Sequence, residues 1–152
     1  MSKEIEFHHK SPNDSPGYLL GQVTMLWQRK QKKCLDPLDL THTQFAMLAA
    51  LGWLSKKSDS VTQVDIANQC NADRMMASKV LRTLQEKGFI TREEHKTDTR
   101  AKTIRLTASG ANVLQKALTE VQKVDLDFFA SLGNGLVSFN DNMVQLIEKN
   151  SV

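Results

Sequence analysis

Three side chains, Arg74, Ser78 and Arg82, follow one another at intervals of four residues. On an α-helix this spacing places them in one row along the surface. An arginine guanidinium can donate two hydrogen bonds to the edge of a guanine, and a serine hydroxyl can contact a base or a phosphate. The row therefore predicts a helix that reads DNA; the alternative is a solvated helix face with no further role.

The apolar residues of the same stretch define the opposite side of that helix. Its expected buried stripe, at the spacing i, i+3, i+4 and i+7, consists of Ala77, Val80, Leu81 and Leu84. Met75 is unusual for a solvated face. It could contact a thymine methyl group, or belong to the core if the helix is rotated by one residue. The residues expected to face outwards are Arg74, Met75, Ser78, Lys79 and Arg82.

Positive charge is concentrated around this helix. Residues 73–107 contain nine Lys or Arg against five acids, while the whole chain has a net charge of +3. A basic segment in a nearly neutral chain is a plausible footprint for nucleic acid. The alternative is a solvated surface with scattered lysines.

Two short helices around a turn are expected to carry the row. Thr62 and Asp65 have the spacing of a capping box, which predicts a helix over about 62–70. Asn71-Ala72-Asp73 then forms a turn before a second helix over about 74–87. Two short helices joined by a three-residue turn are typical of a helix-turn-helix.

The hydrophobic period changes from helix to strand after residue 88. Residues 89–94 and 103–107 predict two strands, and the polar residues 95–101 predict the tip of a β-hairpin. Such a hairpin beside a helix-turn-helix is a wing.

The remaining helices lie towards the two ends of the chain. Ser15 and Pro16 predict a helix to about residue 34, and Thr41 and Gln44 form a second capping box. The helix that follows this box is expected to bury Phe45, Leu48, Ala49 and residues 51–53, including Trp53. A long helix starts at about residue 108. Towards the end, the apolar residues exceed what one small domain can bury; they are Phe128, Phe129, Leu132, Leu136, Phe139, Val144 and Ile147. This excess predicts dimerisation, with an intramolecular bundle as the alternative.

The sequence thus predicts a mainly α fold with a small β-hairpin wing. We expect a flexible arm over 1–14, helical dimerisation regions over 15–36 and 108–150, and a winged helix-turn-helix DNA-binding domain over 37–107. The first ten residues lack the apolar segment of a secretory signal, and no stretch has the roughly 18 apolar residues of a membrane span, so a cytoplasmic protein is expected.

Four motifs in this order resemble the MarR family of transcriptional regulators. They are LTHTQF at 40–45, TQVDIA at 62–67, LQEKGFITR at 84–92, and Asp98-x-Arg100 followed by LTxxG at 106–110. The resemblance covers residues 18–150. The wing motif of the family often reads Asp-Arg-Arg, and Thr99 replaces its middle residue here.

The resemblance implies a homodimer whose first, fifth and sixth helices interlock. It also implies that Arg100 enters the minor groove and that Asp98 orients it, although plain turn chemistry would also explain Asp98. The residues expected to bind DNA are Arg74, Met75, Ser78, Lys79, Arg82, Asp98, Arg100 and Lys102.

Members of the family often bind small anionic or aromatic effectors between the dimer helices and the DNA-reading domain. The candidates to line such a pocket are Tyr18, Trp27, His42, Phe45, Met47 and Trp53. The alternative, that each is a plain core residue, is the more common role of such side chains.

The expected function is therefore a sequence-specific transcriptional regulator, acting as a repressor on a pseudo-palindromic operator. No nucleophile–base pair or glycine-rich phosphate loop suggests an enzyme, and no cofactor or metal is expected. The alternatives are a winged-helix adaptor that binds protein, an oxidant sensor at Cys34, and a zinc site from Cys34, His42 and the His8-His9 pair.

Overall fold

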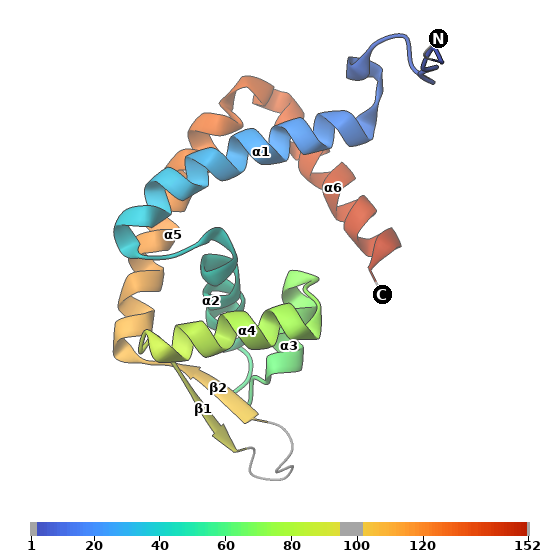
Figure 1. Cartoon of the computed structure of the whole chain (residues 1–152). Coiled ribbons are helices and arrows are strands. Elements are labelled where there is room, and N and C mark those ends of the chain that lie inside the picture. The colour runs from blue at the N-terminus through green and yellow to red at the C-terminus, as the bar shows by residue number, and fades with distance from the viewer. Residues whose placement is uncertain (1–2, 95–101, 152) are drawn as a thin grey trace.

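The computed structural model describes residues 3–94 and 102–151. Helices α1, α5 and α6 form one part of the molecule, and α2, α3, α4 and the hairpin form the other (Figure 1). The elements are η1 (Pro12–Asp14), α1 (Pro16–Leu35), η2 (Asp36–Leu38), α2 (His42–Leu54), α3 (Gln63–Cys70), α4 (Arg74–Glu86), β1 (Ile90–Glu94), β2 (Lys102–Leu106), α5 (Ala108–Phe128), η3 (Ala130–Gly135) and α6 (Leu136–Asn150). None of the helices in the described part of the chain is both long and apolar enough to cross a membrane.

The capping residues begin the helices as the sequence predicts. Ser15 accepts a hydrogen bond from the backbone N–H of Tyr18 at the start of α1. Both predicted capping boxes are complete, Thr41 with Gln44 at α2 and Thr62 with Asp65 at α3. These caps satisfy backbone donors that a helix end leaves free, so the helix starts are fixed locally.

The predicted wing is a two-stranded antiparallel sheet. β1 pairs with β2 in a register that sets Ile90 opposite Leu106. The segment before α3 joins this sheet, because the backbone N–H of Ile104 donates to the carbonyl of Val61 at 2.8 Å. The hairpin is therefore tied to the helix-turn-helix at its base.

The core lies where α2, α3, α4, the hairpin and the first half of α5 meet. Its fully buried large side chains include Leu48, Leu51, Ile66, Leu81, Leu84, Ile90 and Ile104. Helix α5 contributes Leu114, Ala117 and Val121. The predicted stripe of α4 supplies three buried residues, while Val80 is half-buried against the same core.

One prediction about α2 is wrong. Trp53 was expected on the buried face of this helix, but its side chain is 54% exposed. The buried residues of α2 are Gln44, Phe45, Met47, Leu48, Ala50 and Leu51. Because α2 is apolar around most of its circumference, periodicity alone does not reveal which of its faces stays open.

Candidate nucleic-acid interface

Helix α4 begins at a turn formed by Asn71, Ala72 and Asp73. Asn71 ends α3 in the left-handed region with φ of 51°, a conformation that asparagine tolerates. Asp73 then caps α4, its carboxylate accepting from the backbone N–H of Met76 at 2.7 Å. The turn thus sets the direction in which α4 leaves the helix-turn-helix.

The outer face of α4 carries the predicted row. Arg74, Lys79 and Arg82 are exposed, and Ser78 is half-buried. Met75 is 84% exposed, so it is not a core residue. The opposite face is closed against the protein, so α4 presents to solvent a basic surface that also carries the apolar side chains of Met75 and Met76.

The wing extends this surface. Lys102 lies exposed at the start of β2. Arg92 of β1 donates from Nε to Gln85 Oε1 of α4 at 2.8 Å, which fixes the hairpin relative to the helix. The predicted residues Asp98 and Arg100 lie outside the residues that the structure describes.

The junction between α4 and the hairpin is closely packed against α5. Gly88 has φ of +80°, a conformation that favours glycine, and its carbonyl accepts from Thr107 Oγ1 at 2.6 Å. Gly110 lies so close to this junction that an added Cβ would come within 1.9 Å of the Phe89 carbonyl oxygen. The first turn of α5 therefore packs directly on the junction between α4 and β1.

Two of the six candidate effector residues meet at the joint between α1, α2 and α5. The rings of Trp27 and His42 make an edge-to-face contact at 4.9 Å. Trp27 Nε1 and Gln31 Nε2 both donate to Asp125 Oδ1, at 2.8 and 3.1 Å. Burial lowers the pKa of His42, and the nearby carboxylate of Asp125 opposes that shift. Two buried atoms in this cluster, Gln31 Oε1 and His42 Nδ1, have no hydrogen-bond partner in the described part of the chain.

The other four candidates lie in different surroundings. Phe45 is buried at 8% exposure and Met47 is in the core at 1% exposure. Tyr18 lies near the arm, in a hollow formed with residues 6–12 and Ser15. Trp53 borders a separate groove, so the six side chains do not line one common cavity.

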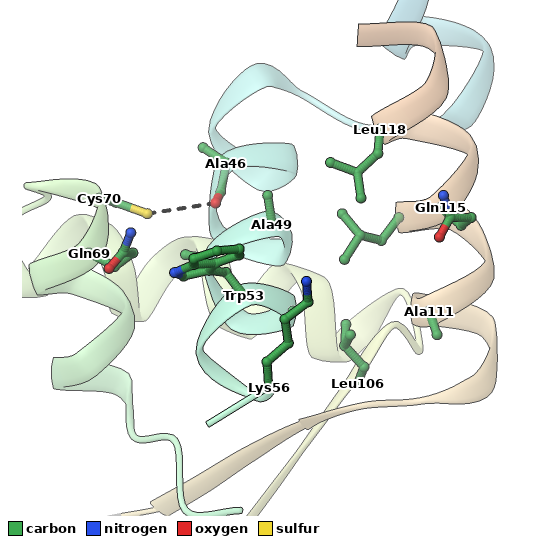
Figure 2. A pocket seen from close by; sticks show the side chains of 13 residues that line it. Ala46, Ala49, Trp53, Lys56, Gln69, Cys70, Leu106, Ala111, Gln115 and Leu118 are labelled. Atoms are coloured by element: carbon green, nitrogen blue, oxygen red, sulfur yellow. Dashed lines mark hydrogen bonds between the residues drawn. The ribbon is translucent and has the colours of Figure 1, made fainter. Parts of the chain in front are cut away.

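That groove runs between α2, the end of α3, β2 and α5 (Figure 2). Its volume is about 710 Å³. Trp53 forms part of its wall, and the ammonium groups of Lys56 and Lys57 lie 5.0 and 5.9 Å from the centre of the indole ring. The lining residues are Ala46, Ala49, Ala50, Gly52, Trp53, Lys56, Gln69, Cys70, Leu106, Ala111, Leu114, Gln115 and Leu118. The groove is therefore apolar with a cationic edge, a combination that suits an aromatic or acyl group bearing negative charge.

The two cysteines lack the surroundings of a reactive thiolate. Burial raises the pKa of Cys34, and the carboxylate of Glu120 adds to this effect. Burial also raises the pKa of Cys70, whose thiol lies 3.7 Å from the Ala46 carbonyl oxygen. The lysines near Cys34 thus do not activate it. Within residues 3–94 and 102–151 no group of three or more His, Cys, Asp or Glu side chains could hold a metal ion.

Sequence reasoning missed the polar residues that hold the site in place. Lys87 contacts Asp39 and Gln44, which are more than 40 residues away in the chain. Asp125 accepts hydrogen bonds from Trp27 and Gln31 of α1, which lie 98 and 94 residues away. Such pairs have no spacing rule along the sequence. Only Gln44 had a visible signal, as the partner of Thr41 in the capping box.

Known proteins share this arrangement. Residues 36–125 match the family model of the ArnR1-like winged-helix domain. An uncharacterized HTH-type transcriptional regulator of Bacillus subtilis, YdcH, is 42% identical over 129 residues, which cover 84% of this chain and 88% of that protein.

Two solved structures share the fold. CouR from Rhodococcus jostii RHA1 bound to p-coumaroyl-CoA aligns with a TM-score of 0.79 at 21% identity, covering 95% of this chain and 99% of that one. A mutant MarR from E. coli complexed with operator DNA aligns with a TM-score of 0.75 at 23% identity, covering 86% and 91%. The family model and the relative from B. subtilis show that the chain belongs to the ArnR1-like winged-helix family of HTH-type transcriptional regulators, and the two solved structures show that its fold is the MarR-like one that the sequence predicts.

Proposed function

We propose that two copies of the chain form a dimer that binds a pseudo-palindromic operator, with α4 of each copy in the major groove. The exposed basic face of α4 carries this proposal, because its side chains stand free of the core and have the chemistry to contact base edges and phosphates. Two-fold symmetry then places the half-site centres about 10 bp apart. The function is DNA reading and not catalysis.

The exposed apolar surface of the end helices supports the dimer. Helix α6 has no buried residue, and Val137 and Leu146 on it are 70% and 61% exposed. On α1, Leu20 and Met25 are 63% and 57% exposed. Apolar surface of this extent on several helices favours contact with a second copy.

The wing is proposed to lie beside the minor groove. Lys102 is exposed at the start of β2, and the motif Asp98-x-Arg100 resembles the one that places an arginine in the groove. A weakly hydrated guanidinium suits the negative potential of a narrow minor groove. A dimer bound across a promoter would occlude it, so we expect a repressor that acts in the cytoplasm.

We further propose that a small molecule regulates DNA binding from the groove at Trp53. The groove joins the DNA-reading elements α3 and β2 to helix α5, so a ligand there would contact both parts of the molecule. Its apolar wall and the ammonium group of Lys56 favour an aromatic or acyl anion. CouR, which shares the fold, was solved with p-coumaroyl-CoA.

Binding-site selection from random DNA, followed by gel shifts and light scattering, tests the reading function. We expect a selected sequence with internal two-fold symmetry, bound by a dimer. A selected sequence without symmetry, or a monomer at micromolar concentration, would contradict the proposal.

Calorimetry with a hydroxycinnamate and its CoA thioester tests the groove. Trp53→Ala should remove binding of whichever compound the wild type binds, while Tyr18→Phe in the separate hollow should leave it unchanged. Equal binding by wild type and Trp53→Ala would place the effector elsewhere.

A further inference from the structure

One lysine holds the end of α4 against the connection between α1 and α2. Lys87 Nζ donates to the backbone carbonyl of Asp39 at 2.5 Å and to Gln44 Oε1 at 3.1 Å. It also lies 3.3 Å from the carboxylate of Asp39. The lysine side chain is only 23% exposed, so these oxygens replace much of the water that an ammonium group would otherwise bind.

The acceptors of Lys87 are themselves fixed. Gln44 is 8% exposed, and its Oε1 also accepts from the backbone N–H of Thr41 in the capping box of α2. Asp39 has φ of 57° and follows η2, which continues directly from the end of α1. An ammonium group bound to these oxygens is therefore tied to the frame formed by α1 and α2.

The other side of the same helix end is tied to α5. Thr107, the N-cap of α5, donates from Oγ1 to the Gly88 carbonyl, one residue after Lys87. The end of α4 thus contacts structure that is continuous with both α1 and α5. These are two of the three helices with which the proposed dimer would be built.

Apolar packing alone would restrain α4 less sharply. Contacts such as those of Leu81 and Leu84 are non-directional, so they tolerate a small rotation of the helix. Hydrogen bonds from a charged donor are short and directional and lose strength when the geometry changes. Lys87 therefore supplies the directional restraint that ties this end of the helix to α2 and to the connection from α1.

We propose that Lys87 is a positioning residue that fixes α4 relative to α1 and thereby sets the half-site spacing that the dimer accepts. The proposal rests on the proposed function as a dimer on a pseudo-palindrome. One added base pair moves a half-site by about 3.4 Å and rotates it by about 35°. A rigid dimer rejects that change, whereas a dimer with a loosened α4 can follow it.

The test measures binding to the selected operator and to duplexes with its centre lengthened or shortened by one base pair. Wild type is compared with Lys87→Met, which keeps the length of the side chain without its charge, and with Lys87→Arg. Lys79→Met is the matched control, since it removes an exposed lysine from the outer face of the same helix. Thermal unfolding of each variant is measured in parallel.

We expect Lys87→Met to lose about tenfold of the discrimination between the natural and altered spacings, comparable to the loss of one base contact. Lys87→Arg should recover part of it, because the charge remains but the compact ammonium does not. Lys79→Met should weaken binding to all three duplexes by the same factor. The same uniform loss in Lys87→Met would overturn the proposal.

A second variant decides the matter if Lys87→Met does not fold. Gln44→Leu removes one acceptor and leaves the charge in place, so it should relax the spacing preference to a smaller extent. Unchanged discrimination in folded Gln44→Leu and Lys87→Arg would then refute the role of Lys87. A wild type that binds as a monomer or ignores spacing would instead refute the proposed dimeric function, and with it the basis for this inference.

Discussion

The part of the molecule formed by α2, α3, α4 and the hairpin, here called the reading unit, buries most of its apolar side chains, whereas the end helices leave most of theirs exposed. Helices α2, α3 and α4 and the hairpin bury theirs, as Leu48, Ile66, Leu81 and Ile104 illustrate with exposures of 0 to 1%. Helix α1 buries Gln31 and Leu35 at its end but leaves most of its other apolar side chains exposed, and α6 has no buried residue at all. The reading unit can therefore satisfy its hydrophobic surface within one chain, and the end helices cannot.

Because of this difference, the stability of the two regions should depend differently on protein concentration. A closed core should resist unfolding independently of protein concentration. Helices that bury their apolar faces on a second copy should gain stability as concentration rises. Helix α5 belongs to both regions, because its first half is packed into the core while Leu126 near its end is 66% exposed.

The largest expected effect comes from disturbing the point where α5 meets the reading unit. In Gly110→Ala the new Cβ would lie 1.9 Å from the Phe89 backbone carbonyl oxygen. A backbone atom cannot swing away as a side chain can, so we expect a loss of about 3 kcal/mol or more in the free energy of unfolding. Chemical denaturation measures it.

Gly17→Ala is the matched control for this change. Nothing lies within 4 Å of a Cβ at position 17 on helix α1. Its free energy of unfolding should stay level or rise by up to about 1 kcal/mol, because alanine favours helix more than glycine does. Equal stability of the two variants would mean that α5 does not pack on the junction as described.

Polar substitutions in the end helices should weaken the dimer and leave the core of the reading unit folded. Leu126→Gln together with Val137→Gln removes two exposed apolar side chains from α5 and α6. If each is buried in a dimer at a value of about 1.5–3 kcal/mol, the dissociation constant should rise by about hundredfold or more. Sedimentation measures this constant.

The control is Val64→Gln, which changes an exposed apolar residue of the reading unit. It should leave the dimer intact. If the double variant stayed fully dimeric, or unfolded like a core mutant, the contrast between the two regions would be wrong.

Substitutions on α4 sharpen the role of the reading unit without touching its core. Arg82→Ala and Arg74→Ala remove exposed guanidinium groups, so thermal stability should change little. Each should weaken binding to the operator by about 1–3 kcal/mol where the arginine pairs with a guanine, and binding to random DNA much less. Equal losses on both DNAs would assign these arginines to phosphates.

Local signals in the sequence were enough to predict most of the fold. Thr41 with Gln44 and Thr62 with Asp65 fix helix starts through neighbouring atoms, and the structure confirms both. The stripe on α4 gave the correct helix phase because its other face is polar. In α2 the same reasoning was wrong for Trp53, since an apolar helix offers no contrast between faces.

The candidate site was less accessible to sequence reasoning because it depends on contacts between distant residues. The rings of Trp27 and His42 do meet, but the carboxylate that holds Trp27 in place, Asp125, is one that no motif indicates. Met47, named as a possible pocket residue, lies in the core instead. Four alanines and a glycine are among the thirteen residues that line the groove at Trp53, and such small side chains leave space open without a recognisable sequence pattern.

The smallest expected effect concerns the joint between the two regions, where His42 starts α2 beneath Trp27. Burial lowers the pKa of His42 in the folded chain, so the unfolded chain binds a proton more readily. The neutral His42 makes its full contribution to the free energy of unfolding above the unfolded-state pKa of about 6.5. This contribution is lost as the pH falls below that value. Wild type should therefore become less stable between about pH 7 and pH 5.5, and His42→Gln should show a shallower slope over that window. Denaturation at a series of pH values measures it, and a slope unchanged in His42→Gln would show that protonation of this histidine is not linked to unfolding.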